Sequence, residues 1–376
     1  MTDRREFLAT TAIGLFSLAR GSAPMDDDLL YVGTYTENTK SEGIYLLRMD
    51  PRSGALRQVA AVSAGPNPSF LTIGPTGPTG RTLYAANELE QTGGGAVSAF
   101  GINRATGALT LVNQQPSQGG APCYVSVDRS GRALLVANYV GGNVGLLPIE
   151  PNGALAPAHM VQHTGKGPNA DRQEGPHAHC IIPDPTNRFA LAADLGADRV
   201  FVYRLDLDAK ALQHVGEAVM RPGAGPRHLA FHPTLPLVFV ANELDSTVAT
   251  LRFNSGDGTL APQSTISTLP TGWTGTNYPA DIHVAANGRT LYVSNRGHNS
   301  IAVFSVTPST GALALAQVIS SEGDWPRNFA LADGWLLVAH QRSDSIVVCG
   351  RDPETGRLTP TRQRIALPSP VCLRFA

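Results

Sequence analysis

Short apolar runs alternate with turn-forming residues along the chain, and one arrangement of them occurs seven times. Each occurrence opens with a proline and a short, mostly apolar run, at Pro68–Leu71, Pro122–Val125, Pro176–His179, Pro226–Leu229, Pro279–Ile282, Pro326–Phe329 and Pro370–Leu373. About 14 to 19 residues after the proline, a second apolar run ends on a polar residue, at Asn87, Asn138, Asp194, Asn242, Asn295 and His340. Near the N-terminus the matching place is Val32-Gly33-Thr34. Runs this short, bounded by turn residues, predict β-strands.

A third apolar run and a tight turn complete each unit. In six units the turn contains a glycine, at Gly54, Gly107, Gly153, Gly258, Gly311 and Gly356. The remaining unit carries Lys210 instead. Glycine supplies the positive φ that a tight hairpin needs. Each unit of about fifty residues is therefore predicted to be a four-stranded antiparallel sheet.

The two ends of the chain hold complementary parts of one unit. Residues 29–60 contain strands two, three and four without an opening proline strand, and residues 370–376 contain that opening strand alone. Combining them in one blade closes a ring and removes the exposed edges that an open array would leave. The sequence thus predicts an all-β fold, a closed seven-bladed β-propeller.

Composition and charge narrow the function. The 39 glycines and 28 prolines among 376 residues suit many short strands joined by turns. Lys and Arg number 29 against 30 Asp and Glu, so the formal net charge of -1 provides no basic surface for nucleic acid or an anionic membrane. We expect neither as a partner.

The four cysteines show no C-x-x-C spacing, which argues against a zinc knuckle or a dithiol redox motif. They are Cys123, Cys180, Cys349 and Cys372, and three of them lie in apolar, strand-like runs. Buried, inert thiols are therefore expected. A bridge between Cys349 and Cys372 stays open as an alternative for an exported protein.

Residues 1–25 differ from the repeat. Arg4 and Arg5 precede an apolar stretch from Ala9 to Leu18, and small residues follow around Ser22. This order is typical of a secretory signal with a twin-arginine n-region, and a disordered basic tail is the alternative. We expect the twin-arginine machinery to export the propeller domain, residues 26–376, to the periplasm or the medium. Without a working signal the protein would remain cytoplasmic. No other run of 18 apolar residues occurs, so no membrane span is expected after processing.

The blade pattern predicts which residues face the central channel. In a propeller the first strand lines the channel and the second runs back antiparallel, so the start of one and the end of the other share a face. The residue after each proline is Ser69, Cys123, His177, Arg227, Ala280, Arg327 or Val371. The residue after each strand-two polar position is Thr34, Glu88, Tyr139, Leu195, Glu243, Arg296 or Gln341.

Three adjacent blades place His177, Arg227, Glu243 and Arg296 at one channel mouth, and these four are the candidate catalytic residues. Arginine binds carboxylate or phosphate through a two-pronged fork, which indicates an anionic ligand. Further candidates for substrate binding are Arg327, Glu88, His179, Asn242 and Gln341.

Two other interpretations use the same residues. Arg227 and Glu243 lie on neighbouring strands, so they could form a purely structural ion pair. A metal site could be built from His177, His179, His228 and Glu243. Strand alternation should turn His228 away from the channel face that Arg227 lines. We therefore expect neither a metal nor another cofactor.

Several motifs resemble those of the propeller lactonase family, which includes 6-phosphogluconolactonases and carboxymuconate-lactonizing enzymes. They begin at Gly175, Gly223, Phe231, Ala241, Ala280 and Ser294, and include Gly-Ala-Gly-Pro-Arg-His and Ala-Asn-Glu-Leu. The resemblance covers nearly all of the chain after residue 25 and implies the same fold. It also implies that His177, Arg227, Glu243 and Arg296 form the site. A twin-arginine signal departs from what a cytosolic sugar phosphate enzyme would carry.

These residues predict hydrolysis of a lactone, a cyclic ester, that bears an anionic group. His177 or Glu243 would take the proton of the attacking water, and the sequence does not choose between them. Arg227 and Arg296 would stabilise the oxyanion. A G-x-S-x-G elbow and a reactive cysteine are both missing, so no acyl-enzyme is expected. The alternative is a non-catalytic exported propeller that binds a ligand or protein partner on the same face.

Overall fold

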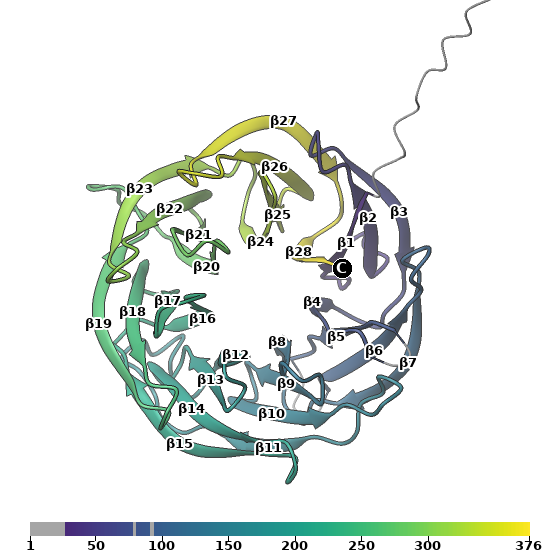
Figure 1. Ribbon diagram of the computed structural model, residues 1–376, viewed down its shortest axis with the longest axis horizontal. Helices are drawn as coiled ribbons and strands as arrows, with labels where there is room; N and C mark the ends of the chain where they lie inside the picture. The colour runs from purple at the N-terminus through teal and green to yellow at the C-terminus, as the bar shows by residue number, and fades with distance from the viewer. Residues whose placement is uncertain (1–26, 78–79, 91–93) are drawn as a thin grey trace, which may run out of the picture.

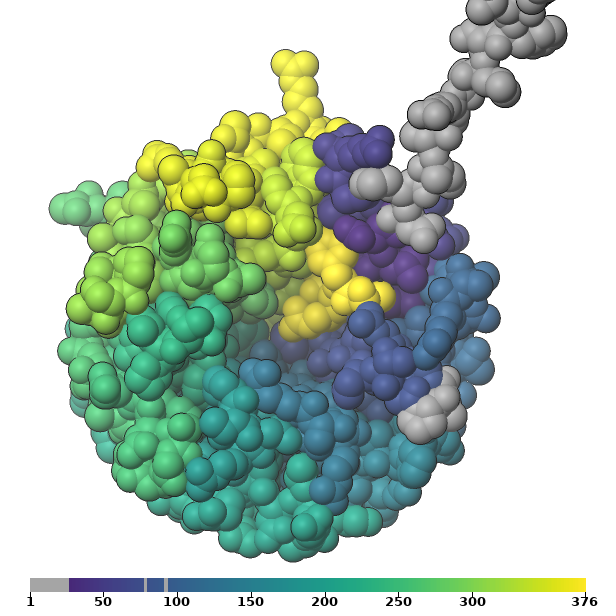
Figure 2. Space-filling view, viewed as in Figure 1, coloured from purple at the N-terminus to yellow at the C-terminus, as the bar shows by residue number. Residues whose placement is uncertain are grey.

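The computed structural model describes residues 27–77, 80–90 and 94–376 as seven four-stranded antiparallel sheets arranged around a central axis (Figure 1). The predicted seven-bladed propeller is confirmed. In the space-filling view the face is hollowed around the axis (Figure 2). Within the described residues no helix is long and apolar enough to cross a membrane. The twin-arginine prediction concerns residues 1–25, which lie outside the described part.

Each blade runs from an inner strand at the axis to an outer strand at the rim. The first three blades are β4 to β7 (Pro68–Ile73, Thr82–Asn87, Ala96–Ile102, Leu109–Pro116), β8 to β11 (Pro122–Val127, Ala133–Asn138, Asn143–Pro148, His159–Gln162) and β12 to β15 (Ala178–Pro183, Phe189–Asp194, Arg199–Asp206, Ala211–Val219). The next three are β16 to β19 (Pro226–Phe231, Leu237–Asn242, Thr247–Phe253, Leu260–Ser267), β20 to β23 (Tyr278–Val284, Thr290–Arg296, Ser300–Val306, Leu313–Ser320) and β24 to β27 (Pro326–Ala332, Trp335–His340, Ser345–Arg351, Leu358–Ala366). The last is β28, β1, β2 and β3 (Pro370–Phe375, Asp28–Thr34, Ile44–Met49, Leu56–Val62).

The second strand is fully or almost fully buried in most blades. All six residues of β5, β9, β13 and β17 are buried, whereas the outer strands β3, β7 and β19 expose much of their length. The apolar side chains pack between neighbouring blades, so that one cluster combines Tyr31 of β1, Phe70 of β4 and Val125 of β8. Burial between sheets explains why the inner strands are apolar without alternation.

The hairpin turns confirm the conformation that the glycines predicted. All six turn glycines have positive φ, between 68° and 85°. Lys210, which replaces glycine in the remaining blade, takes the same left-handed conformation with a φ of 55°. The turn geometry is thus set by the blade, and six of seven units use the residue that adopts it without steric cost.

The ring closes as predicted, because β1 pairs with β28 in one sheet. Tyrosine hydroxyls also tie blades together. Tyr31 donates to the Gly107 carbonyl at 2.7 Å, and Tyr292 donates to the Gly356 carbonyl at 2.7 Å. Each bond joins the second strand of one blade to the hairpin turn of the next.

The predicted strand register is wrong in one blade. In β16, Arg227 is the unpaired bulge residue between Pro226, opposite Asn242, and His228. In β12 the bulge residue is His179, because Ala178 lies opposite Asp194. His179, not His177, is therefore the residue of this blade that corresponds to Arg227. The connection before β12 adds two residues after Pro176, so His177 precedes the strand.

All four cysteines are buried and free. The bridge between Cys349 and Cys372 is therefore absent. Cys349 lies on the third strand of its blade and Cys372 on the axial strand of the next, so the two belong to different layers.

Candidate functional site

Three of the four candidate catalytic residues meet at the channel mouth, around Glu243. Glu243 directly follows β17, Arg227 is the bulge residue of β16, and Arg296 ends β21. Oε2 of Glu243 lies 2.6 Å from Nη2 of Arg296 and 3.0 Å from Nε of Arg227. All three side chains are at most 6% exposed. The register of two blades brings these charges together.

A third guanidinium group, which the sequence analysis missed, completes the shell around this carboxylate. Nη2 of Arg172 donates to Oε1 of Glu243 at 2.7 Å. Arg172 lies in the connection between β11 and β12, which is the longest between two blades. The positions considered from sequence were strand ends only. The length of this connection was the available signal, because it allows the chain to fold back over the mouth.

Burial and charge act in opposite directions on Glu243. Burial alone would raise its pKa, but the guanidinium groups of Arg296, Arg227 and Arg172 lower it to about 2. Both carboxylate oxygens also accept contacts from arginine. A carboxylate held in this way is a weak base.

His177 lies beside this cluster and is fixed on several sides. Its Nδ1 lies 3.0 Å from the Tyr139 carbonyl, and its Nε2 lies 3.0 Å from Oε1 of Glu174. Its ring stacks on Tyr139 with centroids 4.5 Å apart. The His177 backbone N–H donates to Oδ1 of Asp194, which in turn binds His163. Loop and strand together hold the imidazole at the mouth.

Tyr139 links His177 to the glutamate cluster. Nη2 of Arg172 lies 3.3 Å from the Tyr139 hydroxyl and also bonds to Glu243. The structure therefore places all four candidate catalytic residues in one neighbourhood, although His177 follows a different register from the others.

A second group of charged residues lies on the other side of the axis. Nη2 of Arg327 donates to the Tyr35 hydroxyl at 2.7 Å. Tyr35 and Ser69 both donate to Oε2 of Glu88, at 2.9 and 2.5 Å. A narrow cavity on the axis connects the two groups, since Arg227, Arg327 and Glu88 all line it. Tyr35, which follows β1, was also missed from sequence.

Comparison with known proteins assigns the family. A family model described as "Lactonase, 7-bladed beta-propeller" matches residues 29–375. The chain belongs to the seven-bladed β-propeller lactonase family. It is 38% identical over 348 residues to the 6-phosphogluconolactonase of Bacillus subtilis, covering 92% of this chain and 97% of that one.

Two further relatives agree with this assignment. The 6-phosphogluconolactonase of Formosa agariphila is 32% identical, over 90% of this chain and 96% of its own. The structure of the periplasmic gluconolactonase of Pseudomonas aeruginosa superposes with a TM-score of 0.86 and 35% identity, covering 93% of this chain and 99% of that one. The comparisons therefore confirm the predicted family and the predicted enzyme class, a lactonase of the 6-phosphogluconolactonase type.

Three more residues of this lactonase were predicted to bind substrate, namely His179, Asn242 and Gln341. His179 is buried in the channel wall, with its Nδ1 3.6 Å from Sγ of Cys123. Nδ2 of Asn242 donates to Thr247 within the blade, while Oδ1 of Asn242 has no partner among the described residues. Gln341 is partly exposed at the mouth, and its Oε1 is likewise unpartnered there. These contacts favour packing for His179 and Asn242.

Strand alternation predicted that His228 points away from the channel, and this prediction is wrong. It lines the same axial cavity as Arg227, the residue before it. The bulge at Arg227 breaks the alternation, so consecutive side chains face the same space. His228 bonds to Asp281 rather than to the other residues of the alternative metal site. Across the described ranges, no group of three His, Cys, Asp or Glu side chains could hold a metal ion.

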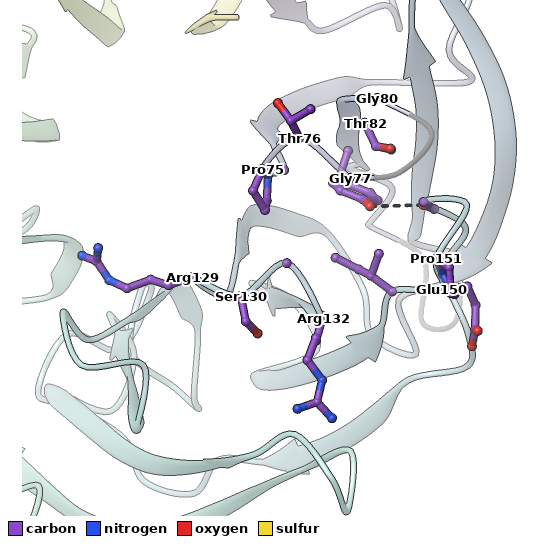
Figure 3. A pocket seen from close by; sticks show the side chains of 15 residues that line it. Pro75, Thr76, Gly77, Gly80, Thr82, Arg129, Ser130, Arg132, Glu150 and Pro151 are labelled. Carbon is purple, nitrogen blue, oxygen red and sulfur yellow. Dashed lines mark hydrogen bonds between the residues drawn. The ribbon is translucent and has the colours of Figure 1, made fainter.

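A large hollow of the lactonase lies away from this cluster. It opens between the blades of β4 and β8, with Thr76, Arg129, Arg132 and Glu150 in its wall (Figure 3). Its loops connect first strands to second strands, and in one blade the third strand to the fourth, so they lie on the face opposite the mouth. None of the candidate site residues lines it.

Proposed function

We propose that the protein hydrolyses a lactone carrying an anionic group, with water attacking at the channel mouth. The excess of positive charge there supports the proposal. Among the groups in direct contact, four guanidinium groups, of Arg172, Arg227, Arg296 and Arg327, stand against two carboxylates, of Glu243 and Glu88 (4 − 2). Asp281 lies farther back, behind His228, and Glu174 lies on the exposed rim. A buried excess of this kind attracts an anion and stabilises negative charge that develops during reaction.

His177 is the proposed general base. The Tyr139 carbonyl can only accept, so Nδ1 of His177 carries the hydrogen. Nε2 faces Oε1 of the exposed Glu174 at 3.0 Å, and it acts as the base when that carboxylate turns aside and leaves its lone pair to water. Nε2 takes a proton from water as the water oxygen bonds to the lactone carbonyl. Glu174, on the rim, then stabilises the imidazolium. Glu243 is not the base, because three arginines hold it as an unreactive carboxylate.

The arginines act on the carbonyl and the anionic group. Arg227 and Arg296 stabilise the oxyanion of the tetrahedral intermediate. As that intermediate collapses, the ring C–O bond breaks and the leaving oxygen takes the proton back from His177, giving a hydroxy acid. Glu243 aligns the guanidinium groups, because its two oxygens fix three of them.

The test is hydrolysis of a panel of γ- and δ-lactones, with and without a phosphate group, by the purified protein. We expect His177→Ala to lower kcat by about 10²–10⁴-fold, the usual contribution of a general base. His159→Ala is the matched control, because His159 is exposed on the outer strand β11. If the wild type opens no lactone faster than buffer does, the non-catalytic ligand-binding alternative is favoured. If His177→Ala retains wild-type kcat, His177 is not the base.

We also infer export through the twin-arginine machinery. The Arg4-Arg5 pair before an apolar stretch supports this, as does the periplasmic relative from Pseudomonas aeruginosa. Cell fractionation and mass spectrometry of the mature N-terminus test it. Replacing both arginines with lysine should keep the unprocessed chain in the cytoplasm. Processed, periplasmic protein from that double variant would contradict the proposal.

A further inference from the structure

A series of buried polar side chains runs from Arg227 along the axial strands. Nη1 of Arg227 lies 3.1 Å from Nε2 of His228, and Nδ1 of His228 lies 2.9 Å from Oδ1 of Asp281 on β20. Oδ2 of Asp281 accepts from Nε2 of His283 at 2.9 Å and from Nδ2 of Asn328 at 2.5 Å. All except His283 are buried or nearly so, and the proposed mechanism uses only Arg227.

Hydrogen-bond chemistry fixes one protonation state for this series. Arginine can only donate, so Nε2 of His228 must be the unprotonated nitrogen. Nδ1 of His228 then carries the hydrogen and donates to Asp281. Burial and the nearby Arg227 lower the pKa of His228 to about 3, which keeps the ring neutral. Burial opposes the charge on Asp281, but His283 and His228 bring its pKa well below the usual range.

This state restricts the orientation of Arg227. Its Nε lies 3.0 Å from Oε2 of Glu243 in an ion pair that lacks hydrogen-bond geometry, and its Nη1 is shared between the Ala280 carbonyl at 2.5 Å and His228. No hydrogen bond from Nη2 to the described residues occurs, and Arg227 lines the axial cavity. Two sides of the guanidinium are therefore held by protein, and Nη2 remains for a ligand.

We propose that His228 and Asp281 are positioning residues that aim the guanidinium of Arg227 at the substrate. The inference rests on the proposed function, since it assigns Arg227 a ligand at the mouth. Asp281 selects the His228 tautomer, and that tautomer supplies the acceptor that holds Nη1. Nε2 of His228 faces Arg227, and Asp281 does not line the axial cavity. Orientation of a catalytic group by a second layer of hydrogen bonds commonly decides its effectiveness.

The first experiment compares two replacements of His228. Glutamine offers an acceptor to Arg227 and a donor to Asp281, whereas leucine offers neither. We expect His228→Gln to keep kcat/KM within about threefold of wild type, and His228→Leu to lower it at least tenfold. His232→Gln is the matched control, because His232 is a buried histidine of the same blade that bonds to Gly288. Equal losses in the glutamine and leucine variants would overturn the proposal.

A double-mutant cycle separates positioning from a merely structural role. If His228 acts through Arg227, His228→Leu should have less than a twofold further effect on kcat/KM in the Arg227→Ala background. Additive effects would overturn the proposal. The same cycle is measured on the affinity for inorganic phosphate by titration calorimetry, which needs no turnover. If the wild type hydrolyses no lactone, the proposed function fails, and the phosphate cycle still decides the positioning role.

The leucine variant could also fail to fold, so Asp281→Asn provides a second route. Asparagine still accepts from His228, but its amide hydrogens face the donors of His283 and Asn328. We expect a loss of kcat/KM of about five- to tenfold that again disappears in the Arg227→Ala background. A loss that persists undiminished there would contradict the role of Asp281.

Discussion

The tetrapeptide Ala-Asn-Glu-Leu occurs twice at the mouth of the propeller, and its two glutamates have different surroundings. Glu243 is 5% exposed and is held by three arginines from β16, β21 and a loop. Glu88, at the matching position after β5, is 16% exposed and accepts from the hydroxyls of Tyr35 and Ser69. Its nearest guanidinium, that of Arg327, is 4.0 Å away.

The difference comes from the strands and loops around each glutamate and not from the tetrapeptide itself. Ser69 follows the opening proline in the Glu88 blade, where the Glu243 blade has Arg227. The asparagines differ too, because Asn87 donates to two carbonyls of the preceding loop and Asn242 donates only to Thr247. The same tetrapeptide therefore carries a carboxylate bonded to hydroxyl groups at Glu88 and a carboxylate surrounded by arginines at Glu243.

The largest expected effect comes from removing the charge of Glu243. In Glu243→Gln, two almost fully buried guanidinium groups lose their counter-charge. We expect a loss of about 3–5 kcal/mol in the free energy of unfolding, the usual cost of breaking a buried ion pair. Lactonase activity should fall more than about a hundredfold. Denaturant titration and steady-state kinetics measure both, and a loss under about 1 kcal/mol would mean that the cluster is not held by its carboxylate.

The next largest effect is the loss of stability that Glu243 causes when the pH is lowered. The pKa of Glu243 is about 2 in the folded protein against 4.5 ordinarily, so the folded state holds its charge to lower pH than the unfolded state. Its contribution is fully present well above pH 4.5, the ordinary pKa, and is lost as the pH falls through 4.5 towards 2. The integrated effect is about 3 kcal/mol.

Unfolding free energies from pH 7 to pH 3 measure this contribution. The gap between wild type and Glu243→Gln should narrow as the pH falls, because Glu243 takes up a proton in the unfolded state before it does so in the folded state, which destabilises the wild type alone. A gap that stays constant with pH would contradict the shifted pKa of Glu243.

The sequence predicts the blades well because the repeat is periodic. The positive φ of the turns and the pairing of β28 with β1 both follow from the pattern. Arg227, Glu243 and Arg296 also lie where the register placed them, since each lies at the end of a strand in a regular blade.

Two of the errors arise where the chain departs from this period, and the third arises at a bulge that recurs at the same place in every blade. Arg172 reaches the site from a loop, whose path no repeat specifies. Because two extra residues precede β12, His179 and not His177 occupies the bulge position that Arg227 has in its blade. The bulge at Arg227 turned His228 towards the channel. Loop paths, offsets and bulges depend on tertiary contacts, which a single sequence does not display.

A smaller effect should follow the removal of the loop arginine from the Glu243 cluster. Arg172 is 34% exposed, so Arg172→Gln should change the free energy of unfolding by no more than about 1 kcal/mol. We expect kcat/KM for an anionic lactone to fall about tenfold, through KM, because one positive charge leaves the mouth. Arg199→Gln, at an exposed pair on the outer strands, is the control. An unchanged KM would show that Arg172 does not face the substrate.

The smallest effect is expected at Glu88, whose carboxylate is bonded mainly to hydroxyl groups. In Glu88→Gln, the amide oxygen can still accept from Tyr35 and Ser69, so the free energy of unfolding should change by about 1 kcal/mol or less. Removing this negative charge raises the excess of positive charge at the mouth, and KM for an anionic lactone should fall about twofold. KM for a neutral lactone, measured in parallel, should not change. A destabilisation as large as that of Glu243→Gln would show that the two glutamates are equivalent after all, and that their neighbours do not determine their roles.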